Sequence, residues 1–176
     1  LRSVLRQAPD IIMIGEIRDP ITAITAVRAA NTGHLVFATL HSPNAASAVQ
    51  SMLSLGVAPH FLASSLLGVV AQRLVRTLCP KCKVEIDISE CPYSFEEVKS
   101  WLGPEEGHMI YGPKGCESCF HGEYSGRIGV FEVLTASRKI RSLISPSRPA
   151  PEIARQAFEE GQIEFRRMAL LKVAKG

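Results

Sequence analysis

The chain has 176 residues, of which 46% are hydrophobic and 21% charged, and its formal net charge is +3. This length and composition are ordinary for a globular protein with a sizeable core. The small net charge gives no argument for a nucleic acid or an anionic membrane as partner, and no apolar run reaches the roughly 20 residues that a membrane-spanning helix needs.

The first 78 residues have an order of elements that is typical of a parallel sheet. The run at 11–15 has no polar side chain, which predicts a strand covered on both faces. Strands and helices then alternate, and this order favours parallel strands joined by right-handed crossovers. In chain order, the predicted elements are a helix end at 1–7, a strand at 11–15, a helix at 20–32, a second buried strand at 34–41, and helices at 44–55 and from 59 to about 78.

The pattern changes at Cys79. Residues 79–126 are rich in Cys, Gly, Pro and charge, with little periodicity beyond a short predicted helix near 94–102. We therefore divide the chain into a core at 1–78, an inserted module at 79–126 and a return segment at 127–176. In the last segment we predict a strand at 127–134 and helices at about 136–145, 150–160 and 165–174.

Charge is distributed unevenly along the second half of the chain. Between Lys83 and Gly112, seven acidic residues face only two lysines, whereas most charged residues from Arg138 onward are Arg or Lys. A contact between two oppositely charged parts of the protein is one explanation. Solvated faces are the more usual one.

Four cysteines form two CxxC pairs, Cys79 with Cys82 and Cys116 with Cys119. Each pair lies among turn-forming residues and presents two thiolates to one side of an ion, and two such pairs complete a tetrahedral zinc site. The 33 residues between the pairs exceed the usual zinc-ribbon gap, which predicts a small inserted subdomain. Disulfides or free thiols are the alternatives, and a redox role explains one pair but not two.

Three other residues lie near enough in sequence to be considered as ligands. Cys91 stands beside a proline and is interpreted as a bystander. His108 and His121 could compete for the metal, but four thiolates need no further ligand.

Polar residues follow the two predicted strands at their carboxyl ends, where open α/β sheets bind ligands. Glu16, Arg18 and Asp19 follow the first strand; His41, Ser42 and Asn44 follow the second, and His34 stands at its start. An acid, an arginine and a histidine meeting there suit phosphate chemistry, because the acid can orient water and the arginine can balance phosphoryl charge. A salt bridge at a strand exit and histidines that cap helices explain the same residues equally well.

Four stretches, in this order, resemble the type II secretion ATPases and the related type IV pilus-assembly ATPases. The first looks like their Walker B segment, the second like their His box, the third like the helix entering their metal-binding module, and the fourth like the return from it. The stretches are APDIIMIGEIRDP, TGHLVFATLHSPNAASAV, LLGVVAQRLVRTLCPKC and GCESCFHGEYSGRIGVFEVL.

The resemblance implies a partial RecA-like P-loop NTPase core with parallel strands, an inserted tetracysteine zinc module and a C-terminal helical subdomain. It implies that Glu16 acts on the attacking water or the Mg²⁺ shell, and that Arg18 joins an arginine network. His41 would lie close to the γ-phosphate, with His34 as its partner in the same motif, and Arg73 near the nucleotide. The four paired cysteines match the zinc ligands of the family.

The chain also departs from the family pattern. No GxxxxGK[ST] motif is present, and the acidic box and N-terminal domain of the family have no match here. The last stretch, IEFRRMALLKVAKG, matches a family segment that is usually richer in acids. Because LRSVLRQ at the start is typical of the end of a helix, we expect a C-terminal part of a longer protein. Because the GxxxxGK[ST] motif is missing, we expect this part to be inert by itself.

The implied whole protein is a hexameric ring that hydrolyses ATP with Mg²⁺. It would lie in the cytoplasm against the inner membrane, contact membrane platform proteins of a secretion or pilus system, and bind no nucleic acid directly. The zinc module favours a secretion or assembly motor over the retraction ATPases. A zinc-stabilised binding module without catalysis and a DNA-uptake or conjugation motor are the alternatives. Against nucleic acid, no aromatic and basic residues interleave as in base-stacking surfaces.

Overall fold

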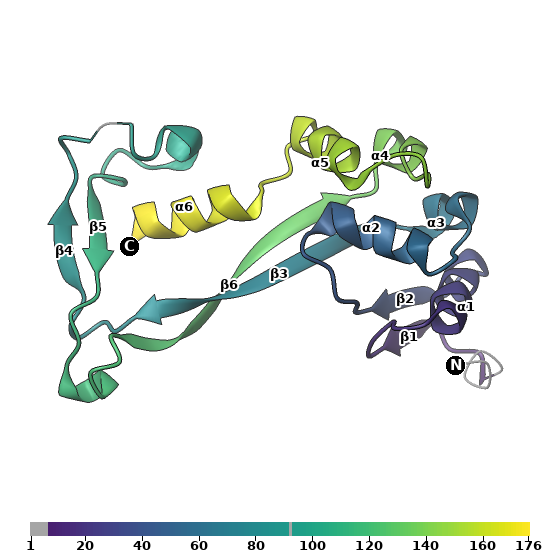
Figure 1. Cartoon of the computed structure of the whole chain (residues 1–176), viewed down its shortest axis with the longest axis horizontal. Coiled ribbons are helices and arrows are strands. Elements are labelled where there is room, and N and C mark those ends of the chain that lie inside the picture. The colour runs from purple at the N-terminus through teal and green to yellow at the C-terminus, as the bar shows by residue number, and fades with distance from the viewer. Residues whose placement is uncertain (1–6, 92) are drawn as a thin grey trace. The chain divides into compact units, whose positions relative to one another are not determined.

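The computed structural model describes residues 7–91 and 93–176 (Figure 1). The helix expected at 1–7 therefore lies outside the described residues, apart from Gln7. The chain divides into two compact units, each with its own cluster of buried hydrophobic side chains. The first unit contains residues 1–71 and 133–162, and the second contains residues 72–132 and 163–176.

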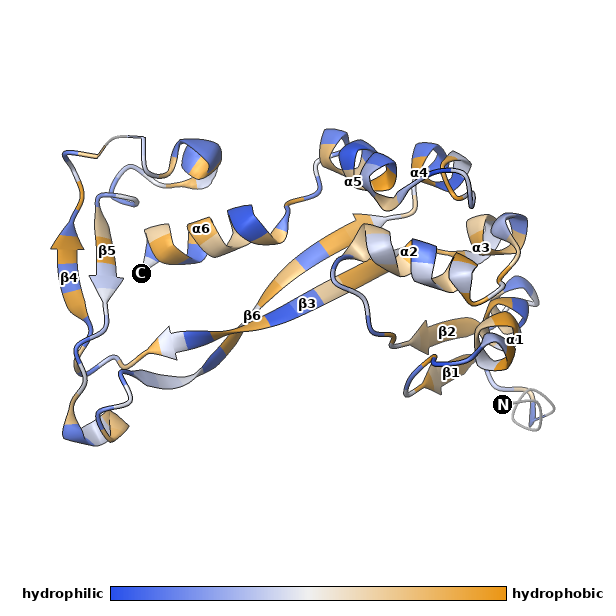
Figure 2. Ribbon diagram, in the orientation of Figure 1, coloured by the Kyte–Doolittle hydropathy of each residue, from blue (hydrophilic) through white to orange (hydrophobic). Residues whose placement is uncertain are grey.

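Two parallel strands and the helix between them begin the first unit. β1 (Ile11–Ile14) pairs with β2 (Leu35–Ala38) in parallel, with Ile14 opposite Ala38, and α1 (Pro20–Asn31) connects the strands. Both strands are mainly hydrophobic in sequence (Figure 2). The predicted parallel pairing is confirmed.

The ends of α1 follow from its sequence. The Asp19 side chain accepts a hydrogen bond from the Thr22 N–H at 2.9 Å. Pro20 occupies the first turn, where its lack of an N–H costs nothing because no intrahelical acceptor is available there. After the helix, Gly33 adopts a φ of 103°, which glycine tolerates without the steric cost of a Cβ. The chain can therefore turn sharply from α1 into β2.

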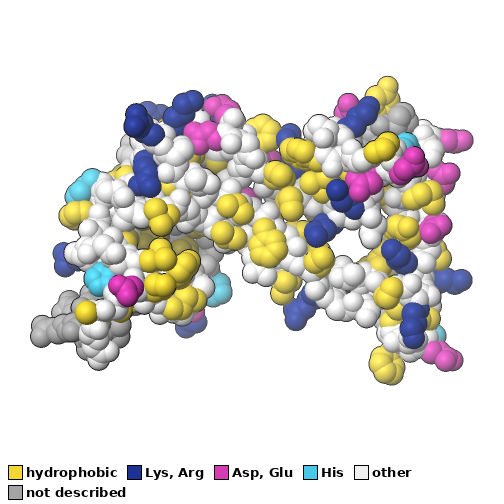
Figure 3. Space-filling view, turned by 180° about the vertical axis from the view of Figure 1, so that it is seen from behind, with side chains coloured by type: hydrophobic (Ala, Val, Ile, Leu, Met, Phe, Trp, Pro, Cys, Tyr) yellow, Lys and Arg dark blue, Asp and Glu magenta, His cyan; other side chains and the backbone are white. Residues whose placement is uncertain are grey.

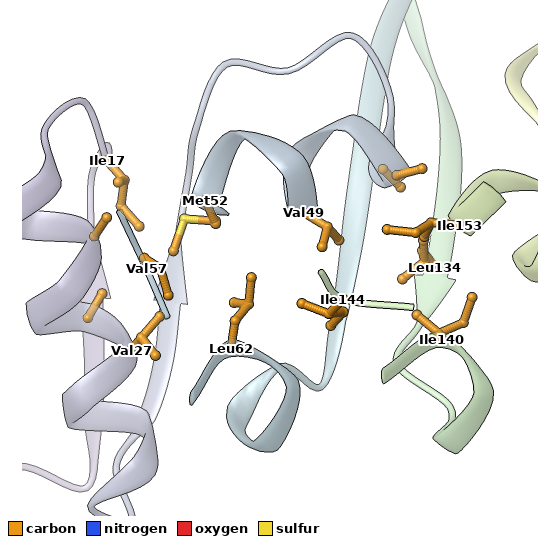
Figure 4. Close-up of a cluster of buried hydrophobic side chains, with 14 of the residues drawn as sticks. Ile17, Val27, Val49, Met52, Val57, Leu62, Leu134, Ile140, Ile144 and Ile153 are labelled. Atoms are coloured by element: carbon orange, nitrogen blue, oxygen red, sulfur yellow. The ribbon is translucent and has the colours of Figure 1, made fainter. Parts of the chain in front are cut away.

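The core of the first unit joins segments that are far apart in the sequence (Figure 4). Val49 on α2, Leu134 on β6, Ile140 on α4 and Ile153 on α5 have at most 1% of their surface exposed. Burial of each such side chain contributes roughly 1.5–3 kcal/mol before entropy is counted. The helices are α2 (Ala45–Ser54), α3 (Pro59–Ser65), α4 (Arg138–Ser142) and α5 (Ala150–Glu159).

The side chains of β1 do not match the expectation of a strand covered on both faces. Ile12 and Ile14 are buried, but Ile11 is 60% and Met13 67% exposed, and Phe37 on β2 is 53% exposed. The expectation is wrong for β1, and the expectation of a second buried strand at 34–41 is wrong for β2, because the described residues pack against only one face of this two-stranded sheet. Hydrophobic side chains are visible on this part of the surface in Figure 3.

The helix predicted from 59 to about 78 is wrong in its second half. α3 ends at Ser65, and β3 (Gly68–Leu78) follows as the neighbour of β6 (Tyr124–Thr135). Gly68 lies so close to β6 that an added Cβ would be 2.8 Å from the Leu134 carbonyl oxygen. The pairing partner lies far along the chain, so local periodicity could not reveal the strand.

The second unit contains a short antiparallel pair that the sequence did not predict. β4 (Val84–Asp87) pairs with β5 (Met109–Gly112). Between them, η2 (Glu96–Trp101) is a 3₁₀ helix and confirms the short helix predicted near 94–102. A second 3₁₀ turn, η3 (Glu117–Cys119), follows β5.

The last helix, α6 (Phe165–Lys175), packs on η2 and β5 within the second unit. Ala174 on α6 is buried with Phe95 and Val98, which is fully buried. Around this apolar contact, Arg166 lies 2.7 Å from Glu97, one of the acids between β4 and β5. The acidic and basic segments therefore contact each other, which is the less usual of the two explanations of the charge pattern.

These ion pairs lie at the surface and contribute little by themselves. The Arg166 side chain is 75% and the Glu97 side chain 40% exposed, and exposed pairs are typically worth about 0–1 kcal/mol. Lys175 lies 3.3 Å from Glu106 in a similar pair. The hydrophobic contact therefore contributes more than these ion pairs to the packing of α6.

The close approach of β3 and β6 gives a test of the revised strand assignment. We expect Gly68→Ala to lower the free energy of unfolding by about 1–3 kcal/mol, because the new methyl group meets backbone that must shift. Chemical denaturation measures this change. Gly103→Ala is the matched control, since its Cβ would meet nothing nearer than 3.7 Å. Equal stability of the two variants would contradict the close pairing at Gly68.

Candidate functional site

Three predicted site residues meet beyond the carboxyl ends of β1 and β2. Glu16 follows β1, and its carboxylate forms an ion pair with Arg18. His41 follows β2, and its Nε2 lies 3.1 Å from Glu16 Oε1. The parallel register brings these side chains to one edge of the sheet, because the exits of paired parallel strands lie side by side. We call Glu16, Arg18 and His41 the acidic edge site.

The Glu16 carboxylate is the centre of the acidic edge site. The hydrogen bond from Arg18 lowers the pKa of Glu16, and the same bond raises the pKa of Arg18. A depressed pKa keeps Glu16 ionised at neutral pH; the pairing stabilises the fold above the unfolded-state pKa and is lost as pH falls through the folded-state pKa. Both partners are exposed, with 76% of the Arg18 and 92% of the His41 side chain accessible.

One oxygen of the Glu16 carboxylate lacks a hydrogen bond within the described part of the chain. Oε1 is buried and accepts no hydrogen bond from the described residues, although His41 Nε2 lies nearby in ion-pair range. A carboxylate oxygen of this kind fits a bound water, the proton of a water, or Mg²⁺ and its hydration shell. The residues present therefore suit the chemistry of a nucleotide–magnesium site.

A cavity of about 390 Å³ opens beside the acidic edge site. Its wall includes Ser51 and Ser54 of α2, which sequence reasoning did not single out. No feature of the sequence favoured them, because α2 also contains Ser47 and Gln50. The remaining lining residues are Glu16, Ile17, Arg18, Leu40, His41 and Leu55.

Other polar residues at the strand exits have structural roles. Asp19 caps α1, and its pKa is lowered by the hydrogen bonds from Thr22. The Asn44 side chain accepts a hydrogen bond from the Ser47 N–H at 2.8 Å and so caps α2. The Ser42 Oγ is buried and has no hydrogen-bond partner among the described residues.

The structure does not bring His34 to the acidic edge site, and Arg73 belongs to the other unit. His34 stands before β2, at the opposite end of the strand from His41, and its Nδ1 lies 3.0 Å from the Ala29 carbonyl oxygen at the end of α1. Arg73 lies on β3 in the second unit, with its guanidinium 5.0 Å from the ring centroid of Phe165. Their nucleotide-binding roles stay predictions.

The four paired cysteines form a single cluster in the second unit. Their sulfur atoms all lie within 4.8 Å of one another. The Cys79–Cys116 sulfurs are 4.0 Å apart, the Cys82–Cys119 sulfurs 3.9 Å, and the Cys116–Cys119 sulfurs 3.8 Å. Thiolates at 2.3 Å from a tetrahedral zinc lie about 3.8 Å apart, whereas a disulfide needs about 2.05 Å. The spacing fits zinc.

The backbone around the cluster prepares it for thiolates. The Cys116 N–H donates to the Cys119 sulfur at 3.3 Å and lowers the pKa of Cys119 to about 7. Burial raises the pKa of Cys82 to about 12, whereas a bound zinc ion would favour the thiolate. β3 and the turn after it position the first pair, since the Cys79 N–H donates to the Glu123 carbonyl oxygen at 2.9 Å.

The other three candidates stand outside this cluster. Cys91 is exposed, and the group of possible metal ligands found among the described residues does not include it. His108 and His121 are not in that group either. Four thiolates therefore complete the site without a histidine.

Comparison with known proteins identifies the family. The family model described as "Type II/IV secretion system protein" matches residues 1–176. The chain therefore belongs to this family. The resemblance inferred from the sequence motifs is confirmed.

Named relatives come from both branches of the family. A type IV pilus assembly ATPase, TfpB, from Acinetobacter baylyi is 41% identical over 176 residues, which is 100% of this chain and 30% of the relative. The type II secretion system protein E of Dickeya dadantii is 42% identical over 176 residues, again 100% of this chain and 34% of the relative. The chain thus spans about a third of the length of these relatives.

A solved structure shows the same fold. The ATPase DotB of Legionella pneumophila matches with a TM-score of 0.63 at 19% identity, over 99% of this chain and 38% of that chain. In the part of the chain that the structure describes, no helix has both the length and the hydropathy needed to cross a membrane.

The cysteine cluster predicts how the purified protein responds to loss of one ligand. We expect one zinc per chain by elemental analysis, and expect Cys116→Ser to lose most of it and to destabilise the second unit. Cys91→Ser is the matched control and should keep the metal. Full zinc content in Cys116→Ser, or equal loss in both variants, would contradict the assignment of the ligands.

Proposed function

We propose that this chain is the C-terminal part of a hexameric motor ATPase that drives type II protein secretion or type IV pilus assembly. Membership of the family and relatives named for both systems support the choice of motor. The observation that carries the catalytic part of the proposal is the meeting of Glu16, Arg18 and His41 at the carboxyl edge of parallel strands, where α/β sheets bind ligands.

Glu16 takes the central role in the proposed reaction. Its ionised carboxylate accepts a proton from the water that attacks the γ-phosphate, or holds a water of the Mg²⁺ shell. When bound with ATP, Mg²⁺ supplies charge that offsets the phosphate oxygens. Oε1, which accepts no hydrogen bond from the described residues, would be the contact atom.

Arg18 and His41 act beside Glu16. Arg18 keeps Glu16 ionised in the resting site, and its exposed guanidinium can turn to phosphate oxygens. His41 lies beside the other carboxylate oxygen, and its Nε2 would donate to the γ-phosphate. We also propose nucleotide contacts for His34 and Arg73; because His34 lies away from this edge, it would act on a nucleotide that a neighbouring subunit of the ring holds.

The organisation of the whole protein completes the proposal. We propose a RecA-like core in residues 1–78, a structural zinc module in 79–126, and a return strand with a C-terminal helical subdomain in 127–176, whose last helix α6 packs within the second unit. The chain contains no GxxxxGK[ST] motif to cradle phosphates, so we expect no hydrolysis from it alone. The complete motor would work in the cytoplasm, peripheral to the inner membrane, on membrane platform proteins, without direct contact to nucleic acid.

Replacement of Glu16 tests the catalytic assignment in the full-length protein. We expect Glu16→Gln to lower kcat about 10²–10⁴-fold, because the amide cannot accept the proton, and to change ATP affinity less than about threefold. Phosphate release and equilibrium nucleotide binding measure the two effects.

The control is Glu159→Gln, which changes an exposed glutamate on α5 in the same way. It should leave both parameters unchanged. Turnover at the wild-type rate in Glu16→Gln would refute the role of Glu16.

A further inference from the structure

Thr39, the residue that follows β2, makes three hydrogen bonds to the chain that leaves β1. Its N–H donates to the Ile14 carbonyl oxygen at 3.3 Å, and its carbonyl oxygen accepts from the Ile17 N–H at 2.8 Å. Its side-chain hydroxyl donates to the Gly15 carbonyl oxygen. These contacts fall on residues at both sides of Glu16.

The spacing of these bonds reveals an irregularity next to Glu16. In a regular parallel ladder, a residue that donates to residue 14 accepts from residue 16. Thr39 accepts from Ile17 instead, so one additional residue stands in the chain that leaves β1. Such a bulge turns a side chain in a new direction and is frequent beside active sites. The chain that carries Glu16 is therefore shaped at this point by Thr39.

The hydrogen bond from the Thr39 hydroxyl does more than give the Gly15 carbonyl oxygen a partner. Thr39 and Gly15 are both exposed, so water could serve the Gly15 carbonyl oxygen equally well. What the hydroxyl adds is a fixed orientation of the peptide between Gly15 and Glu16. On the other side of Glu16, the buried side chain of Ile17, which is 5% exposed, holds the chain to the core.

We propose that Thr39 is a positioning residue, whose hydroxyl fixes the Gly15–Glu16 peptide so that the Glu16 carboxylate faces His41. The inference rests on the proposed function, because it assigns to Thr39 an effect on turnover through Glu16. His41 follows Thr39 by two residues, so the same residue sets both sides of the acidic edge site. A small displacement of a catalytic group costs a large factor in rate.

The test removes the hydroxyl while it keeps the shape of the side chain. In the full-length protein, we expect Thr39→Val to lower kcat about 10–100-fold and to change KM less than about threefold. Thr39→Ser keeps the hydroxyl and should stay within about threefold of the wild-type kcat. Thr77→Val, on exposed β3, is the matched control and should change neither parameter. If Thr39→Val does not fold, Thr39→Ala takes its place with the same expectation.

A double-mutant cycle with Glu16 separates positioning from other roles. In the Glu16→Gln background, we expect Thr39→Val to cause no further loss in single-turnover hydrolysis, because its effect passes through the missing carboxylate. The proposal would be overturned if Thr39→Val lowered single-turnover hydrolysis in the Glu16→Gln background by the same factor as in the wild type. A wild-type kcat in Thr39→Val, or failure of Thr39→Ser to retain activity, would also overturn it.

The same measurements distinguish this inference from the proposed function. Wild-type turnover in Glu16→Gln alone removes the catalytic role of Glu16, and with it the proposed function. Loss of turnover in Glu16→Gln together with full turnover in Thr39→Val removes only the role of Thr39.

Discussion

Parallel hydrogen bonding between β1 and β2 is the constraint on which the candidate site depends. The register sets Ile14 opposite Ala38, and the bonds of Thr39 continue beyond both strand ends. A carboxylate and a histidine that are 25 positions apart in sequence thereby come within 3.1 Å. α1 makes this pairing possible, because parallel strands need a crossover, and its cap at Asp19 begins that crossover immediately after the site.

The second unit depends on a different constraint: the two ends of the long segment between β3 and β6 must be held together. The four thiolates join the two ends of the segment between β3 and β6, and α6 covers part of that segment with an apolar contact around Val98. The oppositely charged residues around this contact are exposed, so their ion pairs add little to the stability of the unit. The unit therefore combines a small hydrophobic cluster with a cysteine cluster whose spacing fits zinc, and small domains commonly need such a metal site.

Much of the fold was readable from the sequence because its elements begin and end at strong local signals. Pro20 and Gly33 bound α1, and the two CxxC pairs indicated a common metal site. β3 was missed because Gly68 and the apolar residues after it fit a helix until their distant partner strand is known. The exposed face of β1 was missed because an apolar run gives no information on what covers it.

The candidate site was predictable in its chemistry but not in its geometry. Polar residues at strand ends indicated which groups would meet, yet the sequence could not separate His41, which reaches Glu16, from His34, which lies at the end of α1. Thr39 gave no signal, because its proposed role depends on hydrogen bonds to a neighbouring part of the chain that has one additional residue. The most direct measurement is a structure of the full-length protein with Mg²⁺ and a non-hydrolysable ATP analogue. The account predicts the Glu16 carboxylate within about 5 Å of the γ-phosphate or its Mg²⁺, through at most one water. A bound nucleotide whose γ-phosphate lies more than about 10 Å from Glu16 in every subunit would contradict it.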